Sequence, residues 1–361
     1  MNRVACWGLS LLALSLPLSA APTDRAAQER AVLDRDVPGL LAEYKIPGVS
    51  IAQIENGRLA FAVAYGTQSD GVPATTKTLY NIASLTKPIS AEVILRLASK
   101  GTFTLDDPLD AYWSDPDLAG DERRKLLTPR IGLSHQTGFP NWRRKQPLAF
   151  TFTPGTAVSY SGEGYEYVAR FAEKKTGEGF EALAERLVFK PLHMAQTAYT
   201  DRPWFAGRIA TPTSADGKAI AYTANTKYFA SDLIHTTPTD YAKFVVSVMR
   251  DEGLTKAIAA ERRRVQGNTK EQECKTEKRR AACADDVGFG LGWEVNRFGD
   301  TTILHHGGRD EGVATYVVAD VTRGDATILF TNSDNGLNLL LPLLERLGAD
   351  ARFVAYMRSA L

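Results

Sequence analysis

A serine and a lysine three residues apart could form the reactive centre of this chain. Ser84 and Lys87 stand in the stretch NIASLTKP (81–88), where we expect a helix to begin. On a helix, side chains at i and i+3 share one face, so the amine of Lys87 would lie beside the hydroxyl of Ser84. Apolar neighbours would partly desolvate the lysine and favour its neutral form. A neutral amine beside a hydroxyl is a general base beside a nucleophile.

The pair also has an ordinary structural interpretation, in which Ser84 caps a helix and Lys87 is solvated. A Ser-x-x-Lys spacing arises by chance roughly once in a chain of this length, so other signals are needed. The sequence has no Gly-x-Ser-x-Gly, no His-Glu-x-x-His and no Walker sequence. His305 and His306 are adjacent in an expected strand, where neighbours point to opposite faces and cannot share a metal ion.

A tyrosine motif offers a group that could move a proton. Tyr160-Ser161-Gly162 stands just before a helical run in the stretch 150–177. A phenol near a serine–lysine pair could relay a proton if positive charge stabilised its phenolate. The alternative is a tyrosine of the core.

A pair of glycines could bring backbone N–H groups to a substrate. His306-Gly307-Gly308 ends an expected strand, and glycines there let the backbone approach a bound carbonyl. The N–H of Ser84, at a helix N-terminus, could supply the second half of an oxyanion hole. The alternative is a tight glycine turn.

The composition is that of an ordinary globular protein. The chain has 361 residues, of which 44% are hydrophobic and 24% charged, and a formal net charge of +1. This balance gives no pull toward nucleic acid or an anionic membrane. The basic stretch 261–280 is interleaved with glutamates and polar residues, so we interpret it as solvated surface and not as a nucleic-acid site.

The first twenty residues have the layout of a secretory signal. Arg3 precedes an apolar run over 7–18, and small residues follow, so we expect cleavage after Ala20. The run is too short for a permanent membrane anchor. Cys6 precedes the run, where a lipoprotein cysteine would follow it. We therefore expect a periplasmic or secreted protein with no integral membrane segment after signal cleavage.

Two cysteines remain after cleavage, Cys274 and Cys283, in one polar segment. In an oxidising compartment two close cysteines are expected to form a local disulfide. A zinc site would need further ligands, and no histidine lies within twenty residues of either cysteine in the sequence.

The first part of the chain predicts a helix, a hairpin and a second helix. Residues 21–45 read as an amphipathic helix. Two β-rich runs over 48–66 meet at Asn56-Gly57, a strong hairpin signal. A helix over 82–100 should end at Gly101.

The last part predicts an antiparallel meander and a closing helix. Three β-rich runs, over 291–306, 313–321 and 326–332, are separated by Gly-Asp or Arg-Gly-Asp turns. The stretch 337–347 is helical in pattern.

These elements predict an α+β (α/β sandwich) fold. Strands at both ends of the chain indicate one antiparallel sheet, which we expect to have five strands and flanking helices. After the signal peptide, 1–20, a single domain would cover 21–361. Its sheet lobe would take about 25–80 and 285–361, and an inserted, mostly helical lobe about 81–284. A site would lie in the cleft between them.

In this order, the three motifs resemble those of the penicillin-recognising serine hydrolases. They are Ser84-x-x-Lys87, Tyr160-Ser161-Gly162 and His306-Gly307-Gly308. The branch with class C β-lactamases, D-alanyl-D-alanine carboxypeptidases and related esterases is the most similar. Further family-like stretches are LSHQTGFP (133–140), FTPGTAVSYS (152–161) and GFGLGWEV (288–295), and the resemblance runs from about 49 to 335.

The resemblance implies a serine acyl hydrolase that works through an acyl-enzyme. Ser84 would attack a carbonyl, while Lys87 and Tyr160 would move protons. The N–H groups of Ser84 and Arg309 would hold the oxyanion, and His306 would hydrogen-bond toward Tyr160 or the substrate. No metal or organic cofactor would be needed.

Two positions depart from the family pattern. Gly162 stands where the family has an asparagine that contacts the acylamide side chain of a β-lactam, and His306 replaces a lysine. Arg309, directly after the glycines, is a candidate to replace the missing charge. We therefore expect activated esters or D-amino-acid peptides to be cleaved better than cephalosporins. An asparagine restored at position 162 should favour a β-lactam over a simple ester.

The sequence leaves the substrate open among a β-lactam ring, a D-amino-acid peptide and a simple ester. One alternative is a true class C-like β-lactamase. Another, of a different class, is a non-catalytic protein that uses the same cleft to bind peptidoglycan or a partner.

Overall fold

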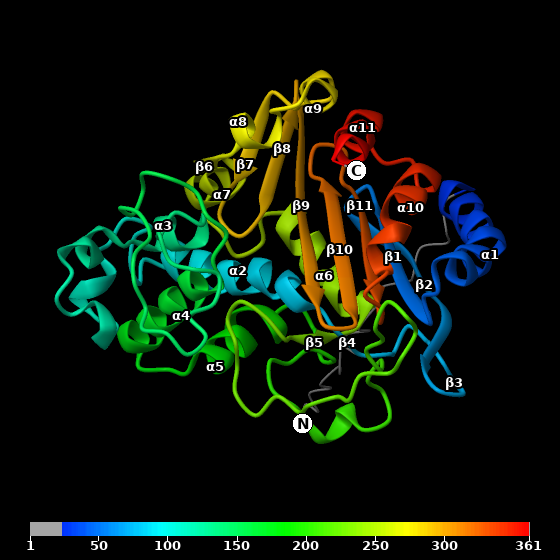
Figure 1. The fold of residues 1–361 in the computed structure, drawn as a ribbon, viewed down its shortest axis with the longest axis horizontal. Coiled ribbons are helices and arrows are strands. Elements are labelled where there is room, and N and C mark those ends of the chain that lie inside the picture. The colour runs from blue at the N-terminus through cyan, green and yellow to red at the C-terminus, as the bar shows by residue number, and fades with distance from the viewer. Residues whose placement is uncertain (1–23, 361) are drawn as a thin grey trace, which may run out of the picture.

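The computed structural model describes residues 24–360, built around one antiparallel sheet (Figure 1). The strand order is β3-β2-β1-β11-β10-β9-β8-β7-β6. Strands from the two ends of the chain meet where β1 pairs with β11, with Val49 opposite Thr331. The predicted α+β architecture, with one sheet shared by both ends of the chain, is confirmed.

Within residues 24–360 the sheet has nine strands, and the expectation of five was wrong. The run 291–306 divides into two strands at a turn, and three short strands join the edges. Two of these have only two residues, too few for a periodic pattern. The strands are β1 (Gly48–Glu55), β2 (Arg58–Ser69), β3 (Val72–Pro73), β6 (Gly267–Asn268), β7 (Asp286–Phe289), β8 (Glu294–Phe298), β9 (Thr301–Asp310), β10 (Val313–Asp320) and β11 (Asp325–Thr331). A separate pair is formed by β4 (Tyr80–Asn81) and β5 (His235–Thr236).

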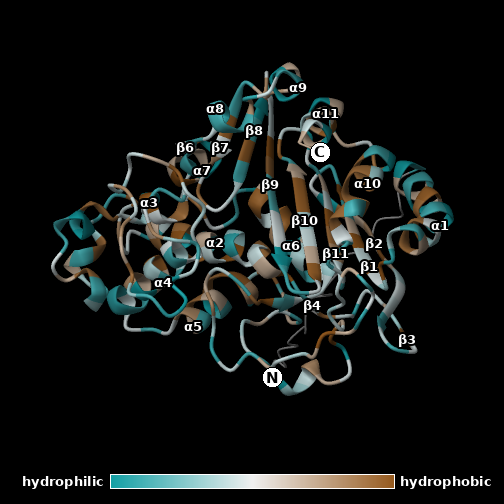
Figure 2. Ribbon diagram, in the orientation of Figure 1, coloured by the Kyte–Doolittle hydropathy of each residue, from teal (hydrophilic) through white to brown (hydrophobic). Residues whose placement is uncertain are grey.

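Helices cover both faces of the sheet. Strands β10 and β11 are mostly hydrophobic, whereas the last residues of β9 are hydrophilic, as Figure 2 shows. Successive side chains on a strand point to opposite faces, so Ile51 packs in one hydrophobic cluster and Ala52 in the other. The first cluster includes α1 (Asp24–Tyr44), α10 (Leu340–Arg346) and α11 (Ala351–Ser359). The second includes α2 (Thr86–Ser99), α4 (Gly162–Thr176) and α6 (Pro238–Met249).

The remaining helices are short, and all of them lie between β3 and β7 in the sequence. They are α3 (Pro129–Leu133), α5 (Phe180–Ala184), α7 (Lys256–Arg263), α8 (Lys270–Glu273) and α9 (Glu277–Ala281). No helix within residues 24–360 is long and apolar enough to cross a bilayer. The predicted signal segment and Cys6 lie outside the described residues.

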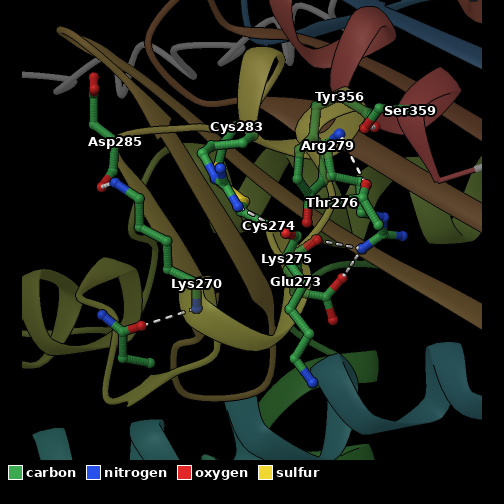
Figure 3. Close-up of a disulfide and its surroundings, with 12 residues drawn as sticks. Lys270, Glu273, Cys274, Lys275, Thr276, Arg279, Cys283, Asp285, Tyr356 and Ser359 are labelled. Atoms are coloured by element: carbon green, nitrogen blue, oxygen red, sulfur yellow. Dashed lines mark hydrogen bonds and ion pairs between the residues drawn. A yellow bond between two sulfur atoms is a disulfide. The ribbon is translucent and has the colours of Figure 1, made fainter.

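A disulfide joins Cys274 and Cys283, as the sequence predicted (Figure 3). It connects α8 to the chain beyond α9, with 6.0 Å between the two Cα atoms. Hydrogen bonds hold the same loop: the side chain of Arg279 donates to the Glu273 carbonyl (2.8 Å), and Lys270 Nζ donates to the Asp285 carbonyl (2.7 Å). The bridge therefore fastens a local surface excursion between β6 and β7.

Candidate active site

The serine and the lysine lie together where the sheet meets α2. The predicted helix begins one turn late, because Ala83–Leu85 form a 3₁₀ turn and α2 starts at Thr86. Lys87 Nζ lies 2.9 Å from Ser84 Oγ and 2.9 Å from the carbonyl oxygen of Ser231. The expected contact between the i and i+3 side chains is therefore present.

Burial makes the lysine a weaker base than usual. The Lys87 side chain is fully buried, and this desolvation lowers its pKa to about 8, although the negative charges of Asp232 and Glu166 oppose the shift. Burial also raises the pKa of Asp232, to about 7. At pH 8, about half of the lysine is therefore neutral.

The backbone under Lys87 is fixed by a carboxylate on α4. Glu166 accepts hydrogen bonds from the N–H groups of Ala230 (3.1 Å) and Ser231 (3.0 Å), and from the Ser231 hydroxyl (2.7 Å). The carbonyl of Ser231 in turn accepts from Lys87. Glu166 thus orients the loop that holds the amine. No sequence motif predicts this arrangement.

Tyr160 lies beside Lys87, two residues before the start of α4. Lys87 Nζ lies 4.7 Å from the centre of the tyrosine ring. Burial raises the pKa of Tyr160, while a hydrogen bond with Ser84 acts in the opposite direction. The phenol is therefore protonated at neutral pH and can donate a hydrogen bond, whereas the sequence-based idea of a stabilised phenolate has no support here.

A histidine missed by the sequence analysis supports the tyrosine. The His135 ring stacks on Tyr160 with 4.3 Å between ring centres, and its Nδ1 accepts from the Ser161 N–H at 3.0 Å. The imidazole is completely buried, which holds its pKa well below the usual range. His135 lies within LSHQTGFP, the family-like stretch that carried no assigned role.

Gly308 lets strand β9 approach the 3₁₀ turn that carries Ser84. A Cβ at this position would stand 2.4 Å from the Ile82 carbonyl oxygen and 2.3 Å from Thr315 Oγ1, so only glycine fits. Strand β8 pairs with β9 only as far as His305, so the edge of β9 beyond it faces the turn and not another strand. Arg309, next along that edge, has an exposed side chain.

His306 is buried and neutral. Its Nδ1 lies 2.7 Å from the Gly307 carbonyl, and burial lowers its pKa to about 3. Its Nε2 has no hydrogen-bond partner within the described chain, although the ring lies 6.1 Å from that of Tyr160. His306 therefore does not replace the positive charge of the family lysine. The predicted hydrogen bond from His306 to Tyr160 is not present. A hydrogen bond from His306 to the substrate stays a prediction.

Trp142 occupies the space beside Gly162. The glycine N–H donates to the Asn141 side chain (2.9 Å). A Cβ on Gly162 would stand 2.9 Å from the Asn141 carbonyl oxygen and 3.0 Å from the Trp142 ring. The ring also lies 6.0 Å from Lys87 Nζ. Asparagine at position 162 would therefore need the 141–142 segment to move, which argues against the simple restoration expected from the sequence.

A cavity of about 1100 Å³ opens from this corner of the site. Its wall is formed by aromatic and charged side chains, among them Trp113, Trp142, Tyr167, Tyr228, Glu166 and Arg170. A second cavity, of about 420 Å³, includes Asn81, Asp310 and His235 and shares Phe229 with the first. The two cavities therefore adjoin each other beside the site.

Comparison with known proteins decides the family. The family model described as Beta-lactamase matches residues 33–347, which is most of the chain. The chain belongs to the beta-lactamase family. It is therefore a serine hydrolase of the broad acyl-hydrolase kind, for which small-molecule or peptide substrates are typical.

Individual relatives differ in their described activities. This beta-lactamase-family chain is 23% identical to "Beta-lactamase" of Escherichia coli K12, over 79% of this chain and 76% of that protein. It is also 23% identical to the "D-alanyl-D-alanine-carboxypeptidase/endopeptidase AmpH" of the same organism, over 94% and 96% of the two chains. The crystal structure of D-alanine carboxypeptidase AmpC from Burkholderia cenocepacia has the same fold, with a TM-score of 0.73, 20% identity, and 89% and 99% of the chains covered.

Proposed function

We propose that this chain is an exported serine acyl hydrolase that cleaves D-amino-acid peptides or esters through a Ser84 acyl-enzyme. The observation that carries the proposal is the 2.9 Å contact between Ser84 Oγ and Lys87 Nζ, made by a lysine that is fully buried. Such an amine can take the hydroxyl proton as the oxygen attacks.

The reaction follows from the groups around this pair. Neutral Lys87 takes the proton of Ser84, whose oxygen adds to the substrate carbonyl. The N–H groups of Ser84 and Arg309 stabilise the negative charge that develops on the carbonyl oxygen. The leaving group takes a proton from the phenol of Tyr160, and protonated Lys87 returns a proton to the phenol. Water then adds to the acyl carbon and gives up a proton to these groups, and Ser84 regains a proton as the acid product leaves.

Support for a peptide or an ester over a β-lactam comes from Gly162 and His306. Gly162 offers no side chain to hold an acylamide, and Trp142 fills the space beside it. His306 is neutral and cannot pair with a substrate carboxylate as a lysine would, which favours an ester that has no carboxylate. The relative AmpH, matched over almost the whole of both chains, is described as a D-alanyl-D-alanine carboxypeptidase and endopeptidase.

The sheet lobe (about 25–80 and 285–361) and the helical lobe (about 81–284) are proposed as parts of one hydrolase domain. The site lies at their junction, because Ser84 follows the first sheet segment and His306 lies in β9. Export is supported by the leader-like sequence 1–20 and by the disulfide.

Labelling of the active-site serine tests the proposal. Wild-type protein treated with a fluorescent fluorophosphonate should be labelled on Ser84, and the variant Ser84→Ala should not. Steady-state rates on a D-alanyl-D-alanine peptide, a p-nitrophenyl ester and a cephalosporin then rank the substrates. An unlabelled but folded wild-type protein would support the non-catalytic alternative. Faster turnover of the cephalosporin than of the ester would identify a true β-lactamase.

A further inference from the structure

The turn that carries the serine has a backbone conformation that must be imposed from outside. Ala83, directly before Ser84, has a φ of +46° and is fully buried. Residues with a Cβ rarely adopt this left-handed region, because the Cβ approaches the following carbonyl oxygen. Contacts with the rest of the molecule must therefore select it.

One amide side chain connects this turn to the end of β9. Asn81 Oδ1 accepts a hydrogen bond from the Ala83 N–H (2.8 Å), and Asn81 Nδ2 donates to Asp310 Oδ2 (2.9 Å). Asp310 is the last residue of β9 and follows Arg309 directly. Asn81 thus spans two segments that lie 229 residues apart in the sequence.

Other contacts hold the residue between Asn81 and Ala83. Thr315 Oγ1 donates to the Ile82 carbonyl (2.9 Å), and the Ile82 N–H donates to the Ile234 carbonyl (2.9 Å). These bonds fix Ile82 against β10 and against the segment before β5. Asn81 instead binds the N–H of Ala83, the residue that has the left-handed conformation.

We propose that Asn81 is a positioning residue for the oxyanion hole, and that it sets the separation of the Ser84 and Arg309 N–H groups by bridging Ala83 and Asp310. This inference rests on the proposed function. A donor must stand close to the place where the oxyanion forms, and loss of one such donor typically lowers kcat about 100- to 1000-fold. A displacement of about 1 Å can cost about 100-fold.

The bridge works because an amide accepts on one side and donates on the other. Aspartate at position 81 would keep the acceptor for the Ala83 N–H, but it would place a carboxylate against that of Asp310. If Asp310 also became asparagine, the introduced amide could donate to the introduced carboxylate. Its oxygen could still accept from the Glu311 N–H, as Asp310 does now at 2.9 Å. Exchange of the amide and the carboxylate between positions 81 and 310 should therefore restore the bridge.

This exchange provides the experiment. Wild type, Asn81→Asp, Asp310→Asn and the double variant are compared on a p-nitrophenyl ester at pH 9, where Lys87 is mostly neutral. Active sites are titrated with fluorophosphonate, so kcat refers to folded, reactive protein. We expect Asn81→Asp to lower kcat about 10- to 100-fold with KM changed less than about threefold. The double variant should return to within about threefold of wild type.

A distant carboxylate supplies the matched control. Asp300→Asn removes one negative charge from an exposed side chain just before the other end of β9, and should leave kcat unchanged. If Asn81→Asp fails to fold, Asp310→Ala removes the acceptor and should also lower kcat per titrated site. Melting temperatures are recorded for all variants.

The outcomes separate this inference from the proposed function. Wild-type kcat per site in Asn81→Asp or Asp310→Ala would overturn the positioning role. So would a double variant that recovers its melting temperature but not its kcat, because the bridge would then be only structural. Absence of labelling in wild type would instead overturn the acyl-enzyme itself, and the positioning role with it.

Discussion

The charge of Asp232 should tune the pH at which the enzyme becomes active. Lys87 must be neutral to act as the base, and its pKa is lowered to about 8. Activity should therefore rise as pH increases through 8, with about one tenth of the lysine neutral at pH 7 and about nine tenths at pH 9. Asp232 raises the pKa of Lys87, so Asp232→Asn should lower it.

The upper limit of the effect follows from the pKa of Lys87. Loss of the Asp232 charge should move the Lys87 midpoint below 8. Because about one tenth of the lysine is neutral at pH 7 in wild type, kcat/KM at this pH should rise by a factor of up to about ten. At pH 9 and above, wild type and variant should be equal. The Leu233 N–H donates a hydrogen bond to Asp232 Oδ1 (2.9 Å), and the side-chain oxygen of an asparagine can accept this bond equally well.

The assay is single-turnover acylation by a p-nitrophenyl ester between pH 6 and pH 10. Asp300→Asn is the matched control, because Asp300 is exposed at the opposite end of β9 from the site. A midpoint that stays at 8 or moves upward in Asp232→Asn would refute the reasoning. A wild-type rate that falls with rising pH would show that Lys87 acts as an acid.

Three further results are expected. Ser84→Ala should abolish hydrolysis while lowering the free energy of unfolding by only about 1–2 kcal/mol, through the loss of the hydrogen bonds of Ser84 with Lys87 and Tyr160; full activity in folded variant protein would contradict the mechanism. Mature protein should titrate no free thiol before reduction, and reduction of Cys274–Cys283 should lower the free energy of unfolding by up to about 3 kcal/mol without loss of the fold; two thiols in denatured, unreduced protein would disprove the bridge. Gly162→Asn should lower kcat/KM on esters and β-lactams alike, because its Cβ displaces the Asn141 carbonyl; a selective gain on a cephalosporin would show that the loop yields.

The parts of the site that the sequence predicts are local in the chain. The contact of Ser84 with Lys87 depends only on a helical turn, so spacing and residue type are sufficient. The hairpin at Asn56-Gly57 is predictable for the same reason, and β1 and β2 pair as expected. The disulfide closes a short segment between neighbouring helices.

The parts that escaped prediction depend on contacts between distant segments. His135 supports Tyr160 by stacking, and Glu166 orients Ser231. No sequence motif joins either residue to its partner. The short strands β3 and β6 have no periodicity to read. The tight space around Gly162 could not be foreseen either, because it is made by the backbone of another loop.

The shared sheet also determines when reactivity can arise. Asn81 and Asp310 bridge segments that are 229 residues apart, and β1 pairs with β11 near the end of the chain. A nascent polypeptide that lacks β9 would have the proposed nucleophile but only half of the proposed pocket for the developing charge. The hydrolase would thus remain latent until nearly its whole length is available to fold.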